Sequence, residues 1–85
     1  MAQHAHTFVE NYDGMVGFGL NRETDESTVI YYLQKFADDA LMNVLRHRMT
    51  DEDLETLFES ISALLRKHLS EEEYHLLFLK EEDEP

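Results

Sequence analysis

Hydrophobic residues recur at three- and four-residue spacing from about residue 25 onward, which is typical of amphipathic helices. The pattern predicts a long helix over residues 25–48, a second helix over 51–69 and a short third helix over 71–80. Thr24 or Asp25 is expected to cap the first helix, because short polar side chains accept hydrogen bonds from the free N–H groups of a first turn. The apolar stripe of this helix consists of Val29, Ile30, Leu33, Phe36, Ala37, Ala40, Leu41, Val44 and Leu45.

The second and third helices have the clearest starting signals. Thr50 with Asp53, and Ser70 with Glu73, match the capping box, in which two residues at a helix start bond each other's backbone N–H groups. No glycine or spare residue stands at either junction, so both are expected to be tight corners. We expect the first two helices to pack as an αα-hairpin, with the third folded across its open end. The stripe of the second helix consists of Leu54, Leu57, Phe58, Ile61, Leu64, Leu65 and Leu69.

Residues 1–24 contain all three glycines and no long helical pattern. Asp13-Gly14 is a two-residue signal for a β-hairpin. The alternative is a short helical turn over residues 8–12 followed by an extended arm. Either version must dock on the helices or on another chain, because a lone hairpin is only marginally stable in water. The expected fold is therefore mainly α, a single domain with an arm or hairpin (1–24), three helices (25–80) and an acidic tail (81–85).

The first and third predicted helices carry more apolar surface than three short helices of one chain can bury. Tyr31 and Met42 widen the stripe of the first helix, and residues 76–79 are apolar on every side of the third. We therefore expect a homodimer, since closed two-fold dimers are the commonest oligomers. The competing interpretation is that the N-terminal arm covers these surfaces within one chain. The candidate interface residues are Tyr31, Tyr32, Met42, Leu76, Phe78 and Leu79.

Charge and composition narrow the classes of partner. The 85 residues have a net charge of −12, and residues 51–85 hold most of the acidic side chains. Binding to nucleic acid or to anionic membranes is not expected, because both require clustered Lys and Arg. The absence of cysteine excludes disulfides and thiolate metal sites. With no signal-peptide pattern and no long apolar run, the sequence predicts a soluble cytoplasmic protein whose partner is itself or another protein.

The N-terminus offers one metal-binding hypothesis. Removal of Met1 would leave Ala2-Gln3-His4 at the start of the chain. The free amine, two deprotonated backbone amides and the His4 imidazole then form a square-planar nitrogen set, which suits Cu(II) or Ni(II). His6 is available as a further ligand. The competing interpretation is a terminal segment with incidental histidines.

No pattern in the sequence predicts catalysis. Glu72 and His75 have the E-x-x-H spacing of di-iron bundles, but the stripes of the other helices contain no inward-facing carboxylates to complete such a site. No cofactor motif is present, and the chain is expected not to be an enzyme. The preferred interpretation is a small acidic interaction or regulatory module. The alternatives are a Cu(II)/Ni(II)-handling protein and an accessory subunit of an enzyme.

Overall fold

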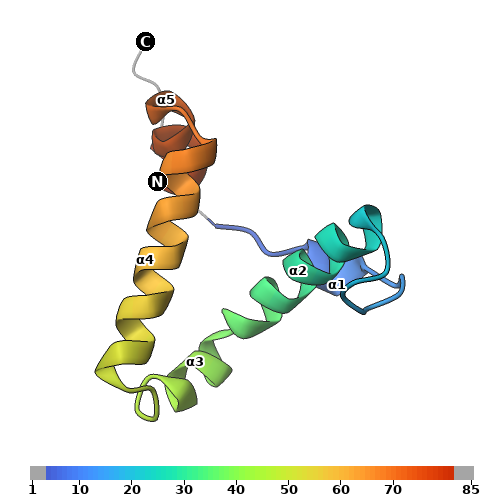
Figure 1. Cartoon of the computed structure of the whole chain (residues 1–85), viewed down its shortest axis with the longest axis horizontal. Helices are drawn as coiled ribbons and strands as arrows, with labels where there is room; N and C mark the ends of the chain where they lie inside the picture. Colours follow the sequence, from blue (N-terminus) through green and yellow to red (C-terminus); the bar gives the residue numbers. More distant parts are fainter. Residues whose placement is uncertain (1–3, 82–85) are drawn as a thin grey trace. The chain divides into compact units, whose positions relative to one another are not determined.

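The computed structural model of the chain describes residues 4–81, and this part is helical with no strand (Figure 1). Its residues divide into two compact units, one of residues Ala5–Arg48 and one that contains residues 49–81 together with His4. No helix in the described part is both long and apolar enough to cross a membrane. The mainly helical prediction is confirmed. The predicted αα-hairpin would join the two units, and it stays a prediction.

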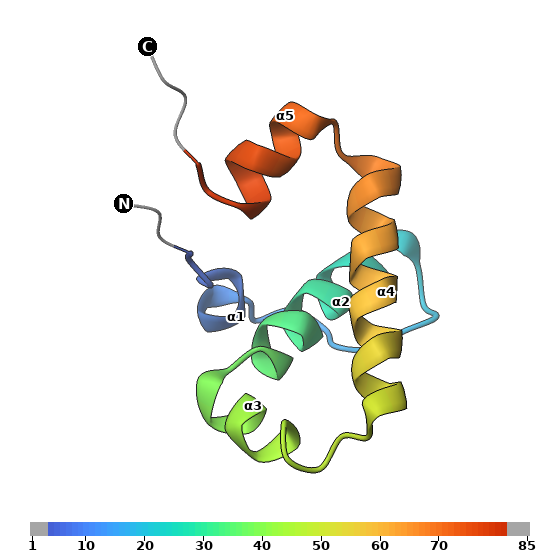
Figure 2. The same cartoon turned by 90° about the vertical axis from the view of Figure 1, so that its left-hand side faces the viewer.

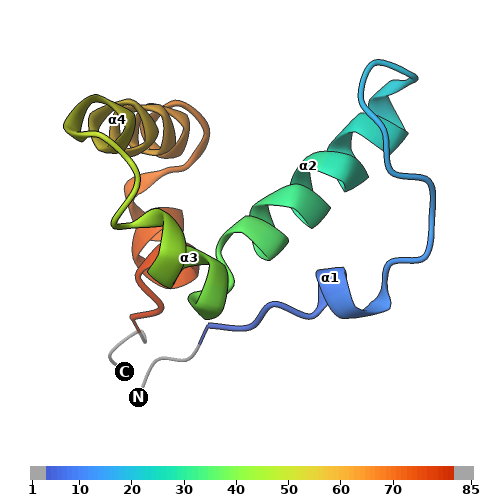
Figure 3. The same cartoon turned by 90° about the horizontal axis from the view of Figure 1, so that it is seen from below.

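The N-terminal arm folds against a helix of its own unit. Helix α1 (Phe8–Asn11) lies beside α2 (Arg22–Phe36), and the irregular chain between them returns along α2 (Figure 3). The predicted β-hairpin is therefore wrong, and the alternative of a helical turn followed by an arm is confirmed. The Tyr12 hydroxyl donates to the Met15 carbonyl oxygen over 2.6 Å, so Asp13-Gly14 lies within a local loop rather than between paired strands.

The predicted helix over residues 25–48 is in fact two helices, α2 and α3 (Asp39–Leu45). Helix α2 begins earlier than expected, because Asn21 caps it and accepts a 2.8 Å hydrogen bond from the Thr24 N–H. The chain leaves the helical conformation at Asp38, whose side chain accepts from the Leu41 N–H over 3.2 Å and caps α3. A short carboxylate that bonds a nearby backbone N–H competes with helix continuation in this way.

The second unit begins as the sequence predicts. Helix α4 (Asp51–His68) starts at a complete capping box, in which the Thr50 and Asp53 side chains each accept a 3.0 Å bond from the other's N–H. Ser70 and Glu73 form the same pair of bonds, over 3.1 and 2.9 Å, at the start of α5 (Glu71–Glu73). The chain turns sharply between these helices (Figure 2).

The predicted third helix is α-helical only as far as Glu73. Residues Tyr74–Phe78 form η1, a π-helical turn, and the Leu79 N–H donates to the Tyr74 carbonyl oxygen five residues earlier. Lys80 has a φ of 60°, and the Glu81 N–H closes the turn on the His75 carbonyl oxygen over 2.9 Å. The His75 ring pairs with the Glu81 carboxylate over 2.7 Å.

Lys80→Gly is expected to raise the free energy of unfolding by about 1 kcal/mol. The left-handed backbone conformation strains every residue that has a Cβ atom, and glycine adopts it freely. Urea unfolding followed by circular dichroism measures the gain. Ala63→Gly, at an exposed position within α4, is the control. Its free energy of unfolding should fall by about 1 kcal/mol, because glycine is a poor helix former and this position has no strain for it to relieve. A loss of stability in Lys80→Gly would contradict this account.

Candidate interaction surfaces

The described residues contain no buried apolar side chain. Thr28, with 5% of its surface exposed, is the one buried residue among them. Folded proteins pack apolar side chains to the density of organic crystals, and this packing is the main favourable contribution to folding. The apolar stripes therefore need a cover that neither unit supplies for itself.

The arm is attached to α2 through polar groups. The Thr28 hydroxyl accepts a hydrogen bond from the Gly17 N–H and donates one to the Gly17 carbonyl oxygen, both over 3.0 Å. The Gly19 N–H donates to the Asp25 carboxylate over 2.8 Å. The Thr28 hydroxyl thus satisfies both the N–H and the carbonyl oxygen of Gly17. Because its own polar group is also hydrogen-bonded, the Thr28 side chain can be buried without an unpaired polar atom.

Tyr31 lies on the same side of α2 as the arm. Its ring contacts Tyr12 at a centroid distance of 5.8 Å, and the Lys35 ammonium lies 5.2 Å from the ring centroid. The Val9 N–H also donates to the Gln34 side chain over 3.0 Å. Tyr31, a predicted interface residue, is therefore half-buried by the arm of its own chain.

An apolar group of residues adjacent to Thr28 on α2 is open. At 100° per residue its members span an arc of about 100°, which begins about 40° from Thr28. They are Val29, Tyr32, Leu33 and Phe36, all exposed. Phe18 of the arm, itself 74% exposed, borders this group and lines a shallow groove together with Gly17, Thr28, Val29, Tyr32 and Leu33. The arm thus covers part of Tyr31, as the competing interpretation expects, and leaves Val29, Tyr32, Leu33 and Phe36 exposed.

The apolar stripe of α4 is likewise open. Phe58 is 73% exposed, and Leu54, Ile61 and Leu64 are also exposed. Only the last part of the stripe, at Leu65 and Leu69, is half-buried. These two residues lie where α5 and η1 turn back beside the end of α4.

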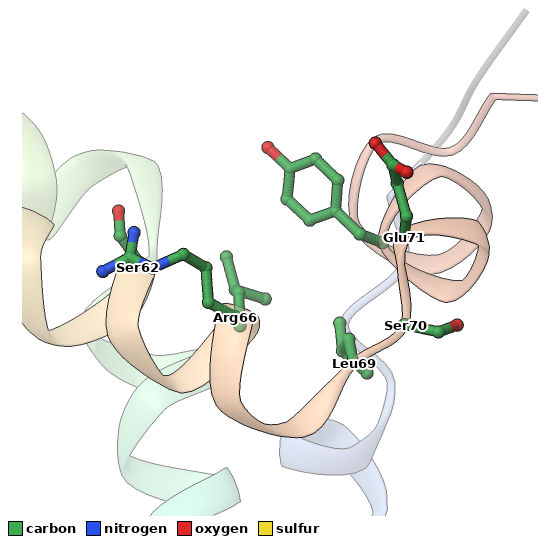
Figure 4. A pocket seen from close by; sticks show the side chains of 7 residues that line it. Ser62, Arg66, Leu69, Ser70 and Glu71 are labelled. Atoms are coloured by element: carbon green, nitrogen blue, oxygen red, sulfur yellow. The ribbon is translucent and has the colours of Figure 1, made fainter.

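A shallow pocket lies at this corner (Figure 4). Its lining combines one cation and one carboxylate with hydroxyl and apolar groups. The lining residues are Ser62, Leu65, Arg66, Leu69, Ser70, Glu71 and Tyr74. The set contains one carboxylate, that of Glu71, and no histidine.

The π-helical turn presents a second apolar group beside the pocket. The rings of Tyr74 and Phe78 stack with their centroids 5.3 Å apart, while Leu76, Leu77 and Phe78 remain exposed. The turn therefore adds apolar surface next to the end of the α4 stripe.

The six predicted interface residues differ in exposure. Tyr32, Leu76 and Phe78 are exposed, whereas Tyr31, Met42 and Leu79 are half-buried. The first three stay candidates without change. Phe58 and Phe18, the two most exposed of the large apolar residues in the described part, were not predicted as interface residues. The sequence shows that Phe58 belongs to an apolar stripe and Phe18 to the arm, but it does not show how exposed they are.

The metal hypothesis falls partly outside the described residues. Ala2 and Gln3 lie beyond them, while His4 and His6 are exposed. Within residues 4–81, no three His, Asp or Glu side chains gather into a ligand set. Binding of Cu(II) or Ni(II) by His4 and His6 with the N-terminal amide nitrogens stays a prediction.

Comparison with known proteins finds no relative for the chain. No protein-family model, no curated protein and no solved structure matches it. The function is therefore argued from the surfaces described above.

Proposed function

We propose that the chain is an interaction module that works as a homodimer. The observation that carries this proposal is the absence of any buried apolar side chain among residues 4–81, although α2 and α4 both have continuous apolar stripes. Large exposed apolar patches on small proteins mark binding surfaces. Self-association is the commonest way to cover such a patch.

The competing way to cover the exposed stripes of α2 and α4 is burial of the two units on each other within one chain.

The arm is bonded to α2 through Thr28, Asp25 and Gln34. Its exposed apolar residues add to the surface that the homodimer or the competing arrangement must cover. They are Met15, Val16, Phe18 and Leu20.

Light scattering behind size exclusion tests the proposal. We expect a species of twice the 10.0 kDa chain mass at micromolar concentration and above. The midpoint of thermal unfolding should also rise with protein concentration, because association stabilises the folded chain by mass action. A single-chain species whose unfolding midpoint does not depend on concentration would overturn the proposal.

A further inference from the structure

Helix α4 is polarised in charge along its length. Its first nine residues contain Asp51, Glu52, Asp53, Glu55 and Glu59. Its last three residues are Arg66, Lys67 and His68, and no acidic residue follows Glu59 within the helix. One half of the helix is thus acidic and the other end is basic, while the apolar stripe runs through both.

The stripe of α4 is symmetric about its centre. Leu54, Leu57 and Phe58 precede Ile61, and Leu64 and Leu65 follow it at matching distances. His68, an exposed residue, lies as far beyond Ile61 as Leu54 lies before it, and on the same side of the helix. A helix face with this symmetry can pair with a second copy of itself.

We propose that α4 pairs antiparallel with α4 of a second copy, about a two-fold axis near Ile61. This inference rests on the proposed function, and it names the surface and orientation of the self-association. Ile61 would then face Ile61 of the partner subunit. Phe58 would face the partner's Leu64, and Leu54 would face the partner's His68.

Charge complementarity favours the antiparallel orientation over the parallel one. In a parallel pair, the acidic halves of two chains that each carry a net charge of −12 lie side by side. In an antiparallel pair, the acidic half of each helix lies beside the basic end of the other. Asp53 and Lys67 lie within about 40° of each other around α4, on the side away from the corner pocket. In the antiparallel pair, Asp53 of each chain would therefore lie near the partner's Lys67. Such pairs select orientation, whereas the apolar stripe supplies most of the affinity.

The absence of cysteine allows a direct test by cross-linking. Leu54→Cys and His68→Cys are made in separate chains, mixed in equal amounts, unfolded, refolded together and oxidised. In the proposed pair these two positions face each other. Two copies of position 54 are about 21 Å apart along the helix axis, which is beyond the reach of a disulfide.

We expect the mixture to give a covalent dimer and each variant alone to give at least about tenfold less. Phe58→Cys with Leu64→Cys is the second pair, chosen because both residues are highly exposed and their replacement costs the single chain little. A covalent dimer from Leu54→Cys alone would show parallel pairing and overturn the inference.

Two further outcomes separate this inference from the proposed function. If the natural sequence is dimeric by light scattering but neither mixed pair forms a cross-link, another face makes the dimer; the antiparallel pairing is then wrong and the homodimer stands. If the natural sequence is a single-chain species and neither pair cross-links, the inference and the proposed function fail together.

Discussion

Ile61→Asp is expected to abolish self-association. At the proposed two-fold axis the change acts twice, because it removes two facing isoleucines and places two carboxylates side by side. Loss of the buried side chains and burial of like charges together cost about 4 kcal/mol or more, which weakens the dimer at least a thousandfold. Sedimentation equilibrium or light scattering over a dilution series measures this change in dissociation constant.

Ala63→Asp is the matched control for Ile61→Asp. It adds the same charge two residues further along the same helix, on the side opposite the apolar stripe, where Ala63 is exposed. This variant should dimerise like the natural sequence within about threefold, since surface substitutions away from an interface change free energies by roughly 0.5 kcal/mol. Equal weakening by both variants would mean that net charge, rather than the stripe, controls association.

The helix starts of the second unit were predictable because their signals are local. The side chain of Thr50 meets the N–H of Asp53 three residues later, and Ser70 meets Glu73 in the same way. A capping box needs no contribution from distant parts of the chain, so its residues alone specify the corner. The apolar stripe of α4 was also predictable, because it follows from the spacing of residues within one helix.

The break at Asp38 was not predictable from periodicity, because apolar residues continue in register on both sides of it. Whether an aspartate caps a new helix or points to solvent within a long one depends on a competition that the stripe does not show. The π-helical form of residues Tyr74–Phe78 is a similar case, since the spacing of four consecutive apolar residues fits any helix type.

The arm shows the limit of the sequence argument for the candidate surfaces. The excess of apolar residues predicted that something must cover the helices, and the arm contains apolar residues that could do so. In the structure the arm instead bonds polar groups of α2 that are 11 or more residues away from Gly17 and Val9. Such long-range hydrogen bonds leave no periodic signal. They also decide which face of α2 remains open for a partner, so the candidate surface depends on them.

Thr28→Val is expected to release the arm from α2. Valine has nearly the shape of threonine but cannot bond the N–H and carbonyl oxygen of Gly17, and leaving such part-buried groups without partners costs about 2 kcal/mol. The exchange rate of the Gly17 and Gly19 amide protons, measured by NMR, should therefore rise about thirtyfold.

Thr28→Ser is the control for this last change, because it retains the hydroxyl and loses only a methyl group. Its amide exchange should stay close to that of the natural sequence. If both variants exchange equally fast, packing of the methyl group rather than the hydroxyl holds the arm.

Release of the arm in Thr28→Val should leave helix α4 and the dimer intact. The arm contacts α2, whereas the proposed interface lies on α4. Loss of the dimer together with the arm would place the interface on the α2 unit instead.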